Sequence, residues 1–201
     1  MSGRREEKKQ LTRQAILDAG MRLFSVKGYK NTSITDLAVE AGIGKGTIYS
    51  YFTTKQELFL AFCREQLYLI NQDIVRSASC EDHVVDQMMA VFTGTFHFIK
   101  QDREFGRLML RESFFPTEHN LEQSQKIENL YIDMLVPILQ RGQERGELRS
   151  ELDLILVIGH FYGLFLITIS AWFTERLASG DDFLETLKTM FYQTMYGLAP
   201  A

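Results

Sequence analysis

Proline is scarce in this sequence, in which only Pro116, Pro137 and Pro200 occur among 201 residues. No segment alternates apolar and polar residues as a half-buried strand does. Apolar residues instead recur at helical spacing in long runs that few breakers interrupt. With 45% hydrophobic and 24% charged residues, the composition is that of an ordinary folded chain. The sequence therefore predicts an all-α protein of about nine helices.

Cysteine is scarce too, since only Cys63 and Cys80 are present. Two cysteines at this separation form neither a disulfide framework nor a zinc site. The four histidines, at positions 83, 97, 119 and 160, show no metal-ligand spacing. We therefore expect no metal, no cofactor and two reduced thiols; a redox role for either cysteine is the open alternative.

Two further absences bear on location and activity. The N-terminal stretch MSGRREEKKQ contains no apolar signal segment, so we expect a cytoplasmic protein. The motifs GxSxG and HExxH and the phosphate-binding loop GxxxxGK[ST] are missing as well. We therefore do not expect an enzyme.

Charge is unevenly distributed along the chain, although the net charge is only −4. Residues 1–60 contain ten Lys or Arg and six Asp or Glu, a balance of +4. The remaining residues contain twelve and twenty, a balance of −8. This asymmetry indicates a basic module joined to an acidic body. Because contact with phosphates depends on local charge, the N-terminal balance and not the net charge is the relevant value for such contact.

Capping patterns and apolar spacing locate the expected helices. The first spans 12–27 and ends at Gly28. A short second helix follows Ser33, which forms a capping-box pattern with Asp36, and ends at Gly42. Further helices are expected at 45–51, 55–79, 82–101, 103–115, 119–145, 152–178 and 182–197.

Residues 41–52, AGIGKGTIYSYF, join two of the short helices. Two short helices connected by a turn that contains glycine form a helix-turn-helix. Ile48 and Phe52, four positions apart, face inward, which leaves Lys45, Thr47 and Tyr49 outward. On pattern alone, a plain helical hairpin with tyrosines covering its core is an equally good interpretation.

A resemblance favours DNA binding over the plain hairpin. The pieces LF…KGY at 23–29, TSITDLAVEAGI at 32–43, KGTIYSYF at 45–52 and the lysine and leucine of KQEL at 55–58 resemble the DNA-binding domain of the tetracycline-repressor (TetR) family of transcriptional regulators. Past residue 60 the likeness is an all-helical layout and GELR at 146–149. The resemblance implies a DNA-binding domain at 1–54 and a helical effector-binding and dimerisation domain at 55–201.

The family pattern also assigns roles to residues. It implies that Lys45, Gly46 and Thr47 meet base edges or nearby phosphates in the major groove, and that Tyr49 packs against the backbone and a base. It further implies that Thr35 approaches a base. The residues implied to hold phosphates are Ser33, Tyr51 and Lys55.

Residues 154–173, LILVIGHFYGLFLITISAWF, are apolar over a length that spans a bilayer. A membrane-associated or protein-interaction module without DNA binding is therefore the alternative function, although an apolar helix is also expected in the centre of a large core. Gly159 and Gly163 form a small-xxx-small pair that lets helices approach closely. The resemblance implies a homodimer built on the last two long helices, the second of which offers Phe183, Leu187 and Phe191.

The middle of the chain is rich in Met and Phe, which is typical of plain core and also of adaptable apolar pockets. The resemblance favours a pocket for a small apolar or amphipathic effector. Arg107 and Arg111 either bind an anionic head group or pair with Glu104 and Glu112. The candidate pocket residues are Met89, Phe92, Phe96, Met109, Arg111, Tyr131, Met134, His160 and Tyr162. The predicted function is a repressor that binds a palindromic operator as a dimer and is released by its effector.

Overall fold

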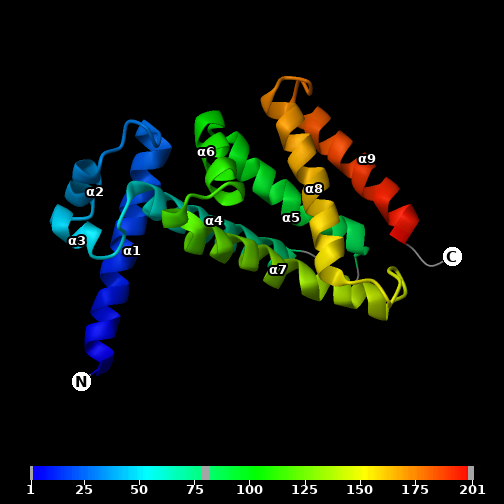
Figure 1. Cartoon of the computed structure of the whole chain (residues 1–201), viewed down its shortest axis with the longest axis horizontal. Coiled ribbons are helices and arrows are strands. Elements are labelled where there is room, and N and C mark those ends of the chain that lie inside the picture. Colours follow the sequence, from blue (N-terminus) through cyan, green and yellow to red (C-terminus); the bar gives the residue numbers. More distant parts are fainter. Residues whose placement is uncertain (1, 78–81, 199–201) are drawn as a thin grey trace. The chain divides into compact units, whose positions relative to one another are not determined.

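The computed structural model describes residues 2–77 and 82–198, so Cys80 lies outside the described residues. Over these ranges every regular element is a helix and no strand occurs, as predicted (Figure 1). The elements are α1 (Ser2–Lys27), α2 (Ile34–Glu40), α3 (Lys45–Tyr49), α4 (Lys55–Ser77), α5 (Val84–Lys100), α6 (Arg103–Phe114), the 3-10 helix η1 (Glu118–Asn120), α7 (Leu121–Glu144), α8 (Leu154–Phe173) and α9 (Gly180–Leu198).

Two helix boundaries differ by five residues or more from those expected, and the others agree within two. Helix α1 begins at Ser2 and not at residue 12, because the added residues 4–10 are Arg, Glu, Lys and Gln, all good helix formers. Helix α8 ends at Phe173, because Glu175 adopts a left-handed backbone conformation with φ 62°. The amide of Arg176 then donates to the carbonyl of Ala171 (2.9 Å), which closes the helix end as a Schellman motif does.

The chain forms two compact units. Unit 1 comprises Met1–Gln66 and Glu104–Ile127, and unit 2 comprises Leu67–Arg103 and Glu128–Ala201. Helix α6 therefore belongs almost wholly to the unit that contains α1, α2 and α3. The compact units are defined by which residues pack together. The division into a DNA-binding domain at 1–54 and an effector-binding and dimerisation domain at 55–201 concerns function, and it stays a prediction.

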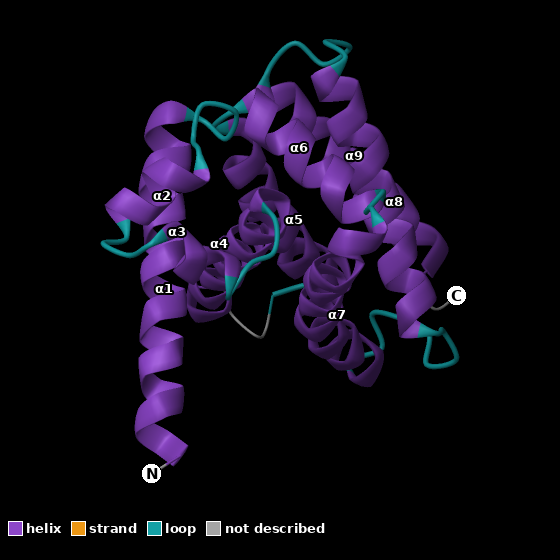
Figure 2. Ribbon diagram, turned by 60° about the vertical axis from the view of Figure 1, so that its left-hand side comes forward, coloured by secondary structure: helices purple, strands orange, loops and turns teal. Residues whose placement is uncertain are grey.

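Unit 1 is built around an aromatic cluster. Phe24 and Tyr29 contact Phe59 of α4 with ring centroids 5.9 and 4.8 Å away. Phe105 of α6 lies edge-on to Phe59 and Phe62, at 4.8 and 5.9 Å. Edge-to-face pairs of this kind stabilise a core beyond the area they bury. Figure 2 shows the short helices α2 and α3 lying beside α1, against which α2 packs.

Unit 2 has its own aromatic core, formed where α5, α8 and α9 pack together. Phe92 of α5 is fully buried and contacts Phe165 of α8 and Phe191 of α9, with ring centroids 5.1 and 5.3 Å away. Phe96 stacks on Phe183 of α9 at 3.8 Å. The apolar run at 154–173 thus contributes one side to this core.

Candidate DNA-binding interface and effector region

The start of α2 is fixed by a capping box. The hydroxyl of Ser33 accepts a hydrogen bond from the amide of Asp36 (3.1 Å), and the Asp36 carboxylate accepts one from the amide of Ser33 (2.8 Å). Hydrogen bonds from the side chain and the backbone of Ser33 lower the pKa of Asp36, and Lys27 adds to the effect. Ser33 therefore orients α2, while Thr35, in the first turn of that helix, is exposed.

The turn between α2 and α3 depends on one glycine. Gly42 has φ +67°, a conformation that side chains other than glycine adopt only at a cost. The amide of Ile43 donates to the carbonyl of Ala38 (2.9 Å) and so closes α2. Gly44 then forms the N-cap of α3 with an extended backbone. The chain turns between α2 and α3 at Gly42, as the glycine pattern predicts.

Helix α3 is held by two anchors and turns its other face to solvent. Ile48 and Phe52 are almost completely buried in unit 1, whereas Lys45, Gly46 and Tyr49 are exposed and Thr47 is half-exposed. A Cβ added to Gly46 would meet nothing within 4 Å. The backbone of α3 is therefore open to close approach by another surface.

The remaining two DNA-binding candidates have different surroundings. Tyr51 is half-exposed and lies two residues beyond the end of α3. The amine of Lys55 donates to the carbonyl of Tyr29 (2.6 Å) and lies 4.0 Å from the centroid of the Tyr29 ring. Burial lowers the pKa of Lys55. Lys55 thus links α4 to the end of α1 within unit 1, a pairing that sequence spacing does not reveal.

Unit 2 brings several of the effector candidates together. The ring of Tyr131 lies 6.4 Å from Phe92 and 5.0 Å from Tyr162, centroid to centroid. The hydroxyls of Thr95 and Tyr131 share a hydrogen bond (2.9 Å). Burial raises the pKa of Tyr162 well above its ordinary value, with further contributions from Tyr131 and Glu128. This cluster combines an apolar wall with hydroxyl groups.

Other effector candidates lie apart from that cluster. Met89 and Met134 are half-buried in unit 2, and Phe96 belongs to the neighbouring stack with Phe183. His160 is exposed on α8, with its Nε2 3.5 Å from the hydroxyl of Thr194 in α9.

Met109 and Arg111 belong to unit 1, where Met109 is buried. Arg111 donates to the carboxylate of Glu112 (2.6 Å), which also accepts from Asn120 (2.9 Å). Glu104 pairs with Lys30 (2.8 Å). Arg111 is thus paired with Glu112 in this structure, and its binding of an anionic head group stays a prediction.

The dimer candidates fall into two groups. Gly159 and Gly163 are exposed, and an added Cβ at either would meet nothing within 4 Å. Phe183, Leu187 and Phe191 have no exposed surface in the single chain, because they pack into the core of unit 2. A partner subunit would therefore meet other side chains of α9 than these three.

Family models match both halves of the chain. Residues 16–62 match a model described as bacterial regulatory proteins of the tetR family, and residues 85–194 match one described as the tetracyclin repressor-like C-terminal domain. The second match alone covers more than half of the chain. The chain belongs to the TetR family.

Relatives and solved structures agree with this assignment. The fatty acid metabolism regulator protein of Bacillus subtilis (strain 168) is 27% identical over 167 residues, which cover 78% of this chain and 81% of that protein. The transcriptional regulator TtgR of Pseudomonas putida is 27% identical over 175 residues, with coverages of 82% and 83%. Among solved structures, Thermus thermophilus FadR in complex with lauroyl-CoA has a TM-score of 0.76 at 20% identity, covering 94% of this chain and 96% of that chain. The structure of Bacillus subtilis FadR with stearoyl-CoA has a TM-score of 0.70 at 19% identity, with coverages of 92% and 98%.

Membership of the TetR family assigns a function to the helix-turn-helix of unit 1. As a TetR-family regulator, the protein binds DNA through the helix-turn-helix of α2 and α3, within the segment 16–62. The sequence-based prediction of a ligand-responsive DNA-binding repressor is thereby confirmed. The roles of individual residues, the operator, the dimer and the effector do not follow from family membership and stay predictions.

Proposed function

We propose that this TetR-family repressor binds a palindromic operator as a homodimer, places α3 in the major groove of each half-site, and leaves the operator when it binds an acyl thioester. The observation that carries the DNA-binding part is the outward face of α3. Lys45, Gly46 and Tyr49 are exposed on a short helix whose inner side is fixed by Ile48 and Phe52. A rigidly held helix with a donor-rich outer face suits base contact.

The proposed roles follow from the surroundings of each side chain. Lys45 donates to guanine or to a phosphate, and the methyl group of Thr47 contacts thymine. Gly46 allows the α3 backbone to approach the bases, and Tyr49 packs against the DNA backbone and a base. In the supporting segments, Thr35 approaches a base and the contacts to phosphate come from Ser33, Tyr51 and Lys55. The hydroxyl of Ser33 also caps α2, so Ser33 has a structural role besides the proposed DNA contact.

The dimer proposal rests on the exposed face of α8. Leu156 and Ile167 are 72% and 58% exposed, and both lie on the same side of the helix as Gly159 and Gly163. α8 is also long and apolar enough to cross a membrane, by length and composition. In a DNA-binding regulator, a second copy of the chain is the partner that covers such a surface. Two-fold symmetry then matches a palindrome whose half-sites lie about one helical turn apart.

Two observations support an acyl thioester as effector. Two structures with the same fold, those of Bacillus subtilis FadR and Thermus thermophilus FadR, are complexes with stearoyl-CoA and lauroyl-CoA. In this chain, the aromatic cluster around Phe92 offers an apolar wall and the Thr95, Tyr131 and Tyr162 hydroxyls offer polar partners. Ligand pockets are typically lined by apolar and aromatic side chains with a few polar groups, so a cluster of this composition suits an acyl chain. Met89, Phe96 and Met134 are the further unit 2 candidates for contact with the chain, and Met109, Arg111 and His160 are candidates outside this cluster.

The mechanism we propose is a population shift. The effector prefers the state in which the two α3 helices are wrongly spaced for the operator, and its differential affinity releases the DNA. The role is regulatory and not catalytic, and we place the protein in the cytoplasm, where the DNA of a bacterium lies.

A selection followed by a titration tests this proposal. Duplexes that bind are first selected from a random pool, and the recovered sequence is expected to be a palindrome with half-sites about 10 base pairs apart. Lauroyl-CoA and stearoyl-CoA are then added to the complex, with CoA and the free fatty acids as controls. We expect release by the thioesters and not by CoA. Failure to recover any duplex would overturn the DNA-binding roles; an operator complex indifferent to every thioester would overturn the effector assignment alone.

A further inference from the structure

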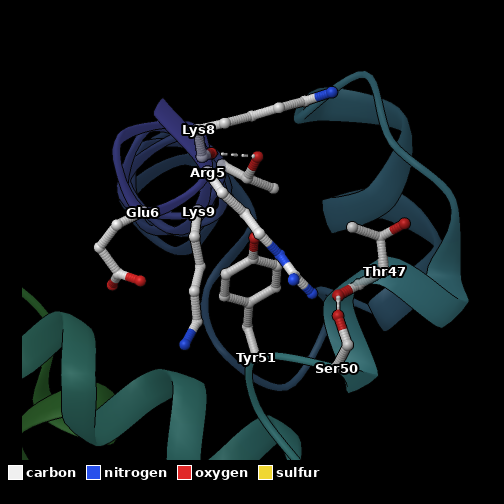
Figure 3. A pocket seen from close by; sticks show the side chains of 8 residues that line it. Arg5, Glu6, Lys8, Lys9, Thr47, Ser50 and Tyr51 are labelled. Atoms are coloured by element: carbon white, nitrogen blue, oxygen red, sulfur yellow. Dashed lines mark hydrogen bonds between the residues drawn. The ribbon is translucent and has the colours of Figure 1, made fainter. Parts of the chain in front are cut away.

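A groove runs beside the recognition helix, between α3 and the N-terminal turns of α1 (Figure 3). Its volume is about 820 Å³. The α1 side consists of Arg5, Glu6, Lys8, Lys9 and Thr12, and the α3 side consists of Thr47, Ser50 and Tyr51. Figure 3 shows the Arg5 side chain reaching from α1 towards Tyr51 and Ser50. A smaller groove of about 450 Å³ continues along α1 past Lys9, Gln10 and Arg13.

The helical form of residues 2–11 creates this groove. Arg5, Lys8, Lys9 and Thr12 stand at positions i, i+3, i+4 and i+7, so they share one face of α1. An unfolded terminus would present these cations in no fixed direction. Because α1 begins at Ser2, the three cations are instead held opposite Thr47, Ser50 and Tyr51.

The charge of the groove is largely uncompensated. Within the described residues, Arg5, Lys8 and Lys9 form no ion pair, and Glu6 is the one acidic residue lining the groove. Arg5 and Lys9 are like charges four residues apart, an arrangement that costs helix stability. An anionic partner would offset that cost. The α3 side of the groove includes Thr47 and Tyr51, both of which are DNA-binding candidates.

We propose that this groove binds the sugar-phosphate backbone of DNA next to the half-site, so that α1 extends the contact made by α3. The proposal rests on the function proposed above, in which α3 enters the major groove. From Arg5 to Thr12 the helix rises about 10 Å, a distance over which one DNA strand carries about three phosphates. The groove thus matches three cations to about three phosphates. These contacts add affinity without choosing sequence, because phosphates carry no base information.

The test uses the full chain and the operator recovered by selection. In the triple variant R5Q/K8Q/K9Q the three cations become glutamines, which have a helix propensity close to that of Lys and Arg. Each phosphate contact contributes about −0.9 to the slope of log K against log salt. We expect the slope to become shallower by about 2 to 3, the base preferences to remain, and the hydroxyl-radical footprint to shorten at its flanks.

Two pairs of neighbours on the same helix serve as controls. Glu6 lines the groove and Glu7 does not, just as Arg5 lines it and Arg4 does not. We expect Glu6→Gln to tighten operator binding and steepen the salt slope, while Glu7→Gln has a much smaller effect. A gain of affinity cannot arise from misfolding. Similarly, Arg5→Gln should weaken binding more than Arg4→Gln does.

The outcomes separate this inference from the function on which it depends. If the unaltered protein binds no duplex, the proposed function fails. If it binds, but the triple variant keeps the slope and footprint, the groove does not contact DNA and this inference is wrong. The inference would also be wrong if Arg4→Gln changed operator affinity as much as Arg5→Gln, or Glu7→Gln as much as Glu6→Gln. Such equal effects would show that only the net charge of the N-terminal segment affects binding.

Discussion

At the scale of single residues, α3 shows how far local pattern determines a surface. The spacing of Ile48 and Phe52 indicates which side of the helix is buried, and the outward positions of Lys45 and Tyr49 follow from it. The surroundings of Lys55, in contrast, cannot be deduced from helical spacing. Its partner Tyr29 lies 26 residues away in the sequence, and only packing around Phe59 brings the two together. Local contacts are predictable from spacing, whereas contacts across the core depend on the whole unit.

Gly46 provides a residue-scale prediction. A Cβ at this position meets no protein atom within 4 Å, and alanine favours helix over glycine by about 1 kcal/mol. We expect Gly46→Ala to leave the melting temperature unchanged or higher, yet to weaken operator binding at least tenfold, because the added methyl group meets the DNA.

Fluorescence anisotropy with labelled operator and thermal unfolding would measure both effects of Gly46→Ala. Val26→Ala, which trims an exposed side chain of α1, is the control and should change neither. Undiminished operator affinity in Gly46→Ala would show that the α3 backbone does not approach the bases.

The capping box of α2 gives a prediction about pH. Hydrogen bonds from Ser33 lower the pKa of Asp36. We expect Ser33→Ala to raise the pKa of Asp36 towards its ordinary value, as followed by NMR titration of the carboxyl carbon. Because the folded-state pKa is depressed, the cap stabilises unit 1 above the unfolded-state pKa, and this contribution is lost as the pH falls through the folded-state value. An unchanged Asp36 pKa in the variant would show that the capping box does not persist in solution.

At the scale of elements, type and order were predictable and two boundaries were not. The apolar run at 154–173 predicted α8, but the left-handed Glu175 that ends it has no sequence signature, since glycine is the usual residue there. The membership of α6 in unit 1 was also not predictable. It depends on the contact of Phe105 with Phe59 and Phe62, residues more than forty positions earlier in the chain.

This contact gives an element-scale prediction. Phe105→Ala removes a buried ring from the aromatic cluster, which typically costs about 3–5 kcal/mol. We expect amide hydrogen exchange to accelerate throughout α1, α4 and α6 in this variant. Phe115→Ala, the same substitution at a side chain that is 81% exposed, should alter exchange by less than the equivalent of about 0.5 kcal/mol. Equal exchange in the two variants would mean that α6 does not stabilise unit 1.

At the scale of the whole molecule, the family resemblance was strong in the first sixty residues and weaker beyond them, where it consisted of the helical layout and GELR at 146–149. The family match over residues 85–194 now covers most of the body as well. What the sequence could not indicate was which face of α9 is buried. Phe183, Leu187 and Phe191 have the spacing of an interface, but the single chain already encloses them. Helical spacing shows that a face is apolar; it does not show whether the same chain or a partner covers it.

The dimer is therefore tested on α8. Ile167→Glu places a charge on the exposed apolar face without entering the core of unit 2. We expect sedimentation velocity to show a monomer at micromolar concentration and the palindromic operator to be bound far more weakly. Val26→Glu, a matched change at an exposed aliphatic residue in unit 1, should remain dimeric. A dimeric Ile167→Glu protein would move the interface away from this face.

The central claim is that the outer face of α3 contacts the operator. The most direct measurement is the dissociation constant of the selected palindrome for the unaltered protein and for the variant with alanine at Lys45, Thr47 and Tyr49, at one salt concentration. Three lost contacts, each worth about 1–3 kcal/mol, predict at least a 100-fold weaker complex with unchanged helical content. Equal dissociation constants would contradict the account.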